Sequence, residues 1–226
     1  MREITVLDDP GAAVAERLTE AAERGGDIVL TGGSTPRGAY ERAARQDADW
    51  SGATVWFSDE RMVPPDHADS NFRMADEALL SRLSRPPRVM RIEGELGAEA
   101  AAGAYEALLR EHLGSDPRFD LILLGMGPDS HVASLFPGKP ELEEHGRFAV
   151  AVPIAGMEPQ VPRVTLTFPV LNRGREVDFL IAGPDKADAV ARAFTEPPDP
   201  EAPAGRVRPD QGSLRVFLDE AAASKL

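Results

Sequence analysis

The chain has 226 residues, no cysteine and a formal net charge of −13, with 38 acidic against 25 basic side chains. This length supports a hydrophobic core without disulfides, and the lack of cysteine excludes disulfide frameworks, thiolate metal sites and cysteine nucleophiles. The acidic balance argues against nucleic acid and anionic membrane surfaces as partners, because both are bound through Lys and Arg. No apolar run reaches the length of a membrane span or a signal-peptide core, so we expect a cytoplasmic protein.

Strand-like and helix-like segments alternate through the first half of the chain. Apolar runs predict strands at residues 4–7, 28–30, 55–57, 89–92 and 121–124, and helical spacing predicts helices at 12–24, 71–83 and 98–113. Another helix is expected from Pro36, with Thr35 as its cap. This alternation predicts an α/β fold with a doubly wound, mostly parallel sheet, Rossmann-like and three-layered.

The pattern changes after Pro137. Strands are expected at residues 148–152, 163–168 and 177–181 with little helix between them, which predicts additional or antiparallel strands in the C-terminal part. A helix at 186–194 follows. Residues 196–211 contain five prolines and are predicted to form a surface loop or flap. Residues 214–223 are ambiguous between strand and helix.

Three predicted strands are each followed directly by a polar loop, at residues 30–38, 56–65 and 123–138. Ligands of open α/β sheets bind at the carboxyl ends of the strands, so we expect these loops to meet at one edge. In the first loop, Gly32 and Gly33 permit close backbone approach, while Ser34, Thr35 and the helix-start amides can hold an anion. The alternative interpretation is a tight turn with an ordinary helix cap.

The other two loops carry the candidate chemistry. Arg61 is placed to fork onto a phosphate or carboxylate, and Asp59 or Glu60 could orient it or bind a sugar hydroxyl, although such a triplet is usually a solvated bend. His131 has Asp129 two residues away, in a turn that we interpret as a second anion-binding helix start. A neutral imidazole can accept a proton from water while a carboxylate holds its tautomer; the alternative is an Asx-type turn with a capping histidine. No zinc, calcium or serine-hydrolase motif occurs, so we expect acid–base chemistry without metal or cofactor.

The loops also carry a family resemblance. The segments GGSTPRGAYE, WFSDERMVPPDHADSNFRMADEALL and FDLILLGMGPDSHVASLFPG, in this order, closely resemble the 6-phosphogluconolactonases, within the superfamily that also contains glucosamine-6-phosphate deaminases. The resemblance continues through PRVTLTFPVLNRGREVDFLIAG to the tail GSLRVFLDEAAA. It implies one domain over residues 1–226, a sugar phosphate lactone as the small-molecule partner, and hydrolysis of 6-phospho-D-glucono-1,5-lactone in the oxidative pentose phosphate pathway. We expect a monomer, with a weak dimer as the alternative.

The resemblance also implies roles for individual residues. It makes His131 the general base and Asp129 its catalytic partner. The positions that it implies in substrate and phosphate binding are Gly32, Gly33, Ser34, Thr35, Arg61, Arg163 and Lys186. Asp59 is added to these as a substrate-binding candidate because of its place beside Arg61 in the second loop. One departure lies inside the catalytic motif, where Ser130 stands in place of the family's usual glycine. If that position takes a positive φ, Ser130 introduces strain or shifts His131.

Two other functions compete with lactone hydrolysis. A glucosamine-6-phosphate deaminase/isomerase is disfavoured because that family follows its Asp-Gly-His with an Asn-Glu segment, whereas residues 131–137 contain no carboxylate here. A non-catalytic sugar-phosphate sensor is the second alternative. Ser130 is the feature that keeps this alternative open.

Overall fold

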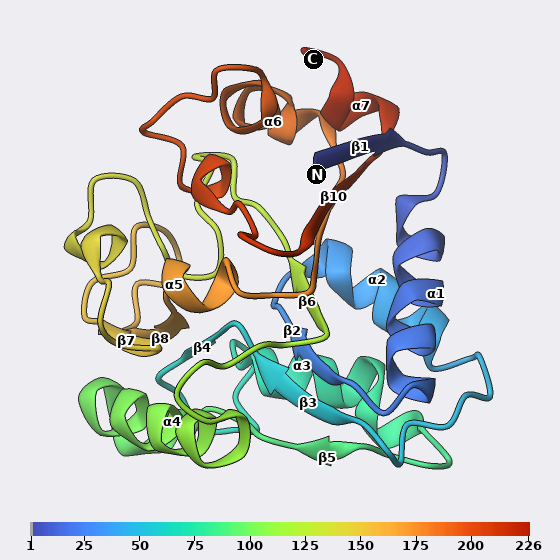
Figure 1. The fold of residues 1–226 in the computed structure, drawn as a ribbon, viewed down its shortest axis with the longest axis vertical. Helices are drawn as coiled ribbons and strands as arrows, with labels where there is room; N and C mark the ends of the chain where they lie inside the picture. Colours follow the sequence, from blue (N-terminus) through green and yellow to red (C-terminus); the bar gives the residue numbers. More distant parts are fainter. Residues whose placement is uncertain (1) are drawn as a thin grey trace.

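A computed structural model describes residues 2–226, and a seven-stranded parallel sheet forms its centre (Figure 1). The strand order is β1-β10-β9-β6-β2-β3-β5, and every neighbouring pair is parallel. The strands are β1 (Arg2–Val6), β2 (Asp27–Leu30), β3 (Thr54–Phe57), β5 (Arg88–Val89), β6 (Leu121–Leu124), β9 (Glu176–Ile181) and β10 (Ser213–Leu218). The predicted α/β fold with a mostly parallel sheet is confirmed.

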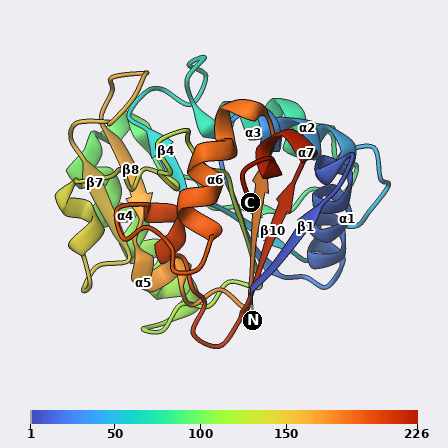
Figure 2. The same cartoon turned by 90° about the horizontal axis from the view of Figure 1, so that it is seen from above.

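Helices cover both faces of this sheet. They are α1 (Pro10–Glu23), α2 (Ser34–Ala43), α3 (Asn71–Ala78), α4 (Ala98–Leu113), α5 (Phe168–Leu171), α6 (Ala187–Phe194) and α7 (Glu220–Ala223). The short 3-10 turns are η1 (Leu80–Arg82), η2 (Gly94–Leu96), η3 (Pro140–Glu143), η4 (Pro184–Lys186) and η5 (Pro203–Arg206). Figure 2 shows α1 and α2 to one side of β1 and β10, with α4 to the other. The layers bury the four apolar residues of β6 completely.

A second, antiparallel sheet supplies the additional strands expected in the C-terminal part. It has the order β4-β8-β7, with β4 (Asp59–Arg61), β7 (Ala149–Val152) and β8 (Arg163–Leu166). Strand β4 is a correction, because residues 59–61 were expected in a polar loop. The register places Arg61 directly opposite Arg163. Like charges directly opposite each other on neighbouring strands repel. This pairing therefore favours an anionic ligand beside the two arginines.

Several local predictions are wrong, and each has a structural reason. Helix α2 begins at Ser34 with Gly33 at its N-cap, and no side chain caps it, so Thr35 does not play the expected role. The turn at His131 does not start a helix; the next helical turn of the described chain is η3. Strand β5 is shorter than expected, and the predicted helix at 71–83 is interrupted at Leu79, where η1 follows.

The C-terminal segments also differ from expectation. Residues 196–211 are not a free flap, because η5 lies within them and Ala202, Ala204 and Val207 are buried. The ambiguous final segment contains both a strand, β10, and a short helix, α7. Within residues 2–226, no helix has both the length and the apolarity needed to cross a bilayer. In the same range, no three His, Asp or Glu side chains gather as a metal site would require.

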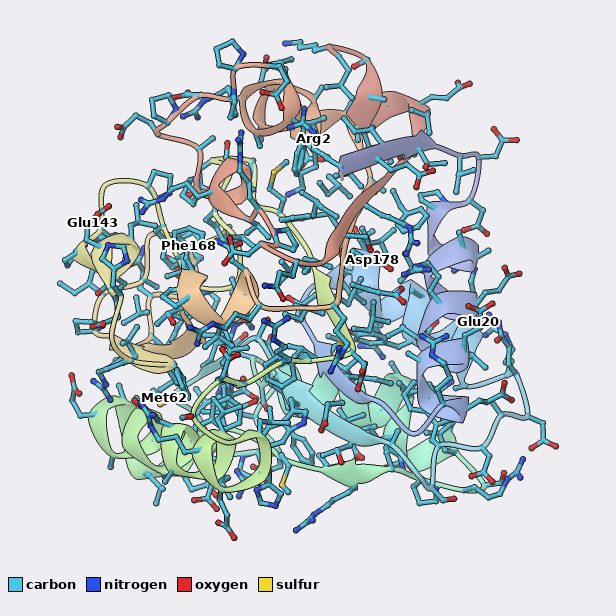
Figure 3. All side chains as sticks on the ribbon, viewed as in Figure 1. Arg2, Glu20, Met62, Glu143, Phe168 and Asp178 are labelled. Atoms are coloured by element: carbon cyan, nitrogen blue, oxygen red, sulfur yellow. The ribbon has the colours of Figure 1, made fainter. Side chains whose placement is uncertain are left out.

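An ion cluster joins α1 to the central sheet. Arg17 of α1 donates to the carboxylates of Asp178 and Glu176 on β9. The Asp178 side chain is only 1% exposed, and Figure 3 shows it in the interior of the molecule. Burial raises the pKa of Asp178 although Arg17 opposes this. Burial also acts to raise the pKa of Glu176, but the hydrogen bonds and charges of Arg17 and Arg215 outweigh it and lower that pKa.

Replacing Arg17 should therefore destabilise the protein. Arg17→Met leaves Asp178 buried without its partner, and we expect the free energy of unfolding in urea at pH 7 to fall by about 3–5 kcal/mol. Arg24→Met is the matched control, since Arg24 is exposed and reaches Glu176 only at 3.7 Å. A loss for Arg17→Met no larger than that of the control would show that the cluster does not tie α1 to the sheet.

Candidate active site

A pocket of about 210 Å³ opens where β2, β3 and β6 end. All three polar loops reach it, through Gly32 and Gly33, through Asp59 and Arg61, and through Gly127 and His131. Arg163 from β8 and Lys186 from η4 complete its basic lining. A hollow of about 230 Å³ adjoins it and is lined by Ser34 and Thr35 at the start of α2, and by Lys186. The fold thus brings the candidate residues from five parts of the chain to one edge of the sheet.

His131 and Asp129 form a hydrogen-bonded pair at this edge. The distance from His131 Nδ1 to Asp129 Oδ1 is 2.6 Å, and the His131 main-chain N–H donates to the same oxygen at 3.1 Å. Burial acts to raise the pKa of the Asp129 carboxyl, but the hydrogen bond and charge of His131 outweigh it, so that pKa lies below its ordinary value. An ionised Asp129 fixes the proton on Nδ1, which leaves Nε2 as the ring nitrogen that can accept one.

The turn around this pair is tightly constrained. Gly127 N–H donates to the His131 carbonyl, and Ser130 N–H donates to the Gly127 carbonyl, each at 3.0 Å. A Cβ on Gly127 would lie 2.0 Å from His131 Nδ1, so only glycine fits beside the ring. Ser130 has φ +72°, in the left-handed region, and is fully buried with no hydrogen-bond partner for Oγ among the described residues. The positive φ considered in the sequence analysis is therefore present, on a serine.

Arg163 brings an unneutralised charge to the pocket. It is 2% exposed, and its hydrogen bonds within residues 2–226 go to the carbonyls of Met157 and Pro159, at 3.2 and 3.3 Å. Its guanidinium lies 5.3 Å from the centre of the Phe136 ring, and its Nε has no described partner. Burial lowers the pKa of Arg163, Asp59 opposes this and Arg61 adds to it. A buried cation without an ion pair favours an anionic ligand beside it.

The other basic groups surround the same space. Arg61 donates through Nη1 to the Asp69 carbonyl at 2.7 Å, while its buried Nε has no described partner. Lys186 Nζ lies 3.3 Å from the Asp185 carboxylate. At the start of α2, Gly33 takes φ +115° and no side chain caps the helix, so the first amides of α2 are free to hold an anion.

Asp59 is the centre of a buried hydrogen-bond network rather than a ligand of Arg61. Its carboxylate accepts from Ser134 Oγ at 2.7 Å, from Ser58 Oγ at 3.0 Å and from Asn71 Nδ2 at 3.3 Å. This network connects β4 with the turn after His131 and with the start of α3. Asp59 lines the pocket, but it does not orient the Arg61 guanidinium as the sequence analysis had allowed.

Glu60 points away from the pocket and anchors α3. Its carboxylate accepts from the main-chain N–H groups of Asn71 and Phe72 at 2.7 Å each, satisfying free amides at the helix start. It also accepts from the main-chain N–H of Arg61. Because the Arg61 guanidinium is held by the Asp69 carbonyl instead, the expectation that Glu60 orients it is wrong.

Sequence reasoning missed Asn71 as a pocket residue. Asn71 lines the pocket, and a Cβ on Gly32 would lie 2.0 Å from Asn71 Oδ1, so the two residues are in close contact. Met157 and Glu158 form another wall that was not anticipated. A signal for Asn71 was available: it stands at the predicted start of the helix that follows the charged second loop.

Comparison with known proteins identifies the class of protein that has this fold and this sequence. The 6-phosphogluconolactonase of Synechocystis is 39% identical over 221 residues, covering 94% of this chain and 90% of that protein. The human 6-phosphogluconolactonase is 45% identical over 177 residues, covering 76% of this chain and 68% of that protein. The crystal structure of 6-phosphogluconolactonase from Thermotoga maritima superposes with a TM-score of 0.85 at 35% identity, covering 97% of this chain and 100% of that one.

These relatives are named as enzymes, and a family model also matches this chain. The family described as glucosamine-6-phosphate isomerases/6-phosphogluconolactonase matches residues 5–216. The chain belongs to this family.

The strained turn gives a stability prediction. Ser130→Gly removes both the left-handed strain of an L-residue and a buried hydroxyl without a partner, so we expect the free energy of unfolding to rise by about 1–2 kcal/mol. Ala133→Gly is the matched control, since Ala133 also has a positive φ (51°) but no hydroxyl, and its gain should be smaller. Urea denaturation measures both variants. A loss of stability in Ser130→Gly would mean that the serine side chain contributes favourably to the turn.

Proposed function

We propose that this protein hydrolyses 6-phospho-D-glucono-1,5-lactone to 6-phospho-D-gluconate, the lactonase step of the oxidative pentose phosphate pathway. The observation that supports this proposal best is that His131, hydrogen-bonded to Asp129, lines the same pocket as Arg163, a buried arginine with no ion-pair partner among residues 2–226. The hydrogen-bonded histidine can activate water, and the buried arginine can bind an anion. The names and identities of the relatives support the choice of substrate.

In the proposed mechanism, His131 acts as general base. Its Nε2 takes a proton from a water molecule whose oxygen attacks C1 of the lactone, and the carbonyl electrons move onto the carbonyl oxygen. When the carbonyl re-forms, the bond between C1 and the ring oxygen breaks and the imidazolium returns the proton to that oxygen. Asp129 holds the ring through Nδ1 and stabilises its charged form. General-base assistance of this kind contributes about 10²–10⁴ in rate.

We assign the substrate phosphate to the wall formed by Arg61 and Arg163. The two residues are directly opposite in the register of β4 and β8, both line the pocket, and each has a buried Nε without a described partner. A phosphate between them would relieve their repulsion and accept charge-assisted hydrogen bonds. Lys186 already has Asp185 beside it at 3.3 Å, so its need for an anion is smaller.

The first prediction of this function concerns the base. His131→Ala should lower kcat for freshly generated lactone by about 10²–10⁴, after subtraction of the spontaneous rate, because no group then accepts the proton of the attacking water. His145→Ala, which changes an exposed histidine outside the pocket, should retain wild-type kcat. An activity of His131→Ala close to wild type would rule out the mechanism.

A second prediction concerns the phosphate. Arg163→Gln should raise KM about 10–100-fold by removing charge-assisted hydrogen bonds to the anion. Lys186→Gln should raise KM less, because Lys186 is partly neutralised by Asp185. Steady-state kinetics compares the two variants. A larger increase in KM for Lys186→Gln than for Arg163→Gln would show instead that the phosphate binds at the wall formed by Lys186 and α2.

The alternative functions are separated by their products. Release of ammonia from glucosamine 6-phosphate would establish a deaminase, although residues 131–137 carry no carboxylate after the histidine. Binding of 6-phosphogluconate without any turnover of lactone would establish a sensor. We propose lactone hydrolysis over the sensor because the His131–Asp129 hydrogen bond is formed even though Ser130 occupies the strained position, and over the deaminase because of that missing carboxylate.

A further inference from the structure

The segment of residues 196–211 reaches back to the catalytic turn. The Ala204 main-chain N–H donates to the Ser130 carbonyl at 3.0 Å, and both residues are fully buried. Ser130 is the residue between Asp129 and His131. A segment that the proline content marked as a surface loop therefore contacts the main chain of the turn that carries the proposed base.

Asn172 holds the part of this segment that follows Ala204. Its side chain donates through Nδ2 to the Arg206 carbonyl at 3.2 Å and accepts through Oδ1 from the Arg208 N–H at 2.6 Å. Its own carbonyl accepts from the Asp210 N–H at 3.0 Å. One residue, at the C-terminal end of α5, thus holds the main chain at three points, which run from the last residue of η5 to Asp210.

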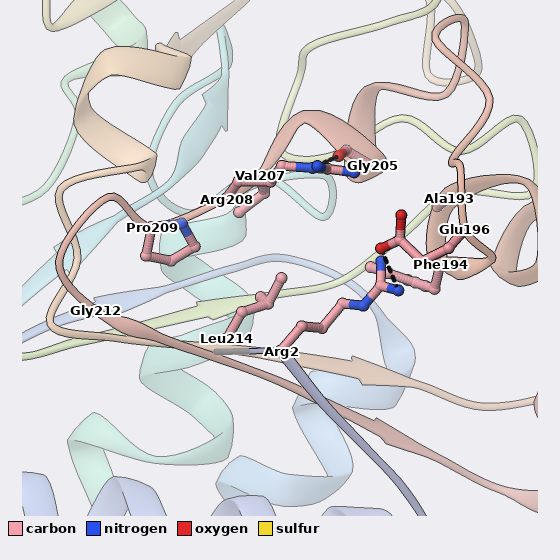
Figure 4. Close-up of a pocket in the computed structure, with 10 residues that line it drawn as sticks. All are labelled: Arg2, Ala193, Phe194, Glu196, Gly205, Val207, Arg208, Pro209, Gly212 and Leu214. Carbon is pink, nitrogen blue, oxygen red and sulfur yellow. Dashed lines mark hydrogen bonds and ion pairs between the residues drawn. The ribbon is translucent and has the colours of Figure 1, made fainter.

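The segment around η5 is packed on one side and open on the other, because Ala202, Ala204 and Val207 are buried while a cavity lies beside Gly205. This cavity has a volume of about 140 Å³. It is bounded by Gly205, Val207 and Arg208 of the segment and by Arg2 and Leu214 at the start of β1 and β10 (Figure 4). On the open side, hydrogen bonds add to the packing of the buried side chains in holding the segment in place. The bond to Ser130 is made by Ala204 within η5, and the bonds to Asn172 are made by Arg206, Arg208 and Asp210 at the end of η5 and beyond it.

We propose that Asn172 is a positioning residue for His131, acting through η5 and Ala204 on the backbone of Ser130. An L-residue at φ +72° returns to negative φ when its restraints are lost, and the bond from Ala204 is one of those restraints. A rotation at Ser130 would turn His131 relative to Asp129. The effect on turnover rests on the proposed function, whereas the effect on the turn itself does not.

The test begins with Asn172→Ala. We expect kcat to fall about tenfold, since small displacements of a catalytic group are costly, while KM changes less than about threefold because Arg61 and Arg163 lie on the other sheet. Arg192→Gln is the matched control: it breaks the 2.7 Å contact with Asp199 in the same segment, away from Asn172, and should keep wild-type kcat. Asn172→Asp keeps the acceptor for Arg208 and should show a smaller loss, provided that it folds.

A double-mutant cycle distinguishes positioning from general damage. In the Ser130→Gly background, Asn172→Ala should lower kcat less than about threefold, because glycine takes a positive φ without being held. An equal loss of kcat in the two backgrounds would overturn the proposal. So would an Asn172→Ala enzyme with unchanged kcat.

Hydrogen–deuterium exchange gives a readout that does not depend on activity. Amide protection across residues 127–135 should fall at least tenfold in Asn172→Ala and remain unchanged in Arg192→Gln. Unchanged protection in Asn172→Ala would contradict the connection between Asn172 and the turn. If the wild-type protein hydrolyses no lactone, the proposed function fails, yet the exchange experiment still decides whether Asn172 holds the turn.

Discussion

A buried positive charge without an ion pair is the constraint on which the site depends. Arg163 is 2% exposed and faces Arg61 across two short antiparallel strands. Such an arrangement is unfavourable in the absence of an anion, since both desolvation and like-charge repulsion oppose it. The pocket is lined by Arg61, Arg163 and Lys186 against the carboxylates of Asp59 and Glu158, a positive formal charge that contrasts with the net charge of −13 of the whole chain. The net charge of the whole chain affects which macromolecules can bind, whereas the residues that line the pocket determine which small molecule can bind.

The parallel sheet supplies the other half of the site. It delivers Gly32 and the start of α2 from the end of β2, and the Asp129–His131 turn from the end of β6. The backbone of this turn is strained, because Ser130 takes a left-handed conformation. It is also tightly packed, because no residue larger than glycine fits at Gly127. Strained backbone persists where surrounding contacts over-determine it, and the buried segment around η5 provides such contacts. The unpaired arginine and the strained turn meet in one pocket, which is typical of sites selected for chemistry rather than for stability.

The sequence predicted best the features that depend on local patterns. The fully apolar β6 and the amphipathic α4 were expected with the bounds that the structure shows. The convergence of the three loops followed from strand direction alone. Strand β4 could not be predicted because its three charged residues become a strand only when β8, about a hundred residues later, pairs with them. The role of residues 196–211 was hidden for a similar reason, since the contact between Ala204 and Ser130 joins two irregular segments.

The central claim is that an anionic group of the substrate binds against Arg61 and Arg163 while His131 activates water for attack on a lactone. The most direct measurement compares kcat/KM of the purified protein for freshly prepared 6-phospho-D-glucono-1,5-lactone and for D-glucono-1,5-lactone, which lacks only the phosphate. We expect a preference for the phosphorylated lactone of at least about 10², equivalent to a few kcal/mol of charge-assisted binding. Equal values of kcat/KM for the two lactones, or hydrolysis of neither, would contradict it.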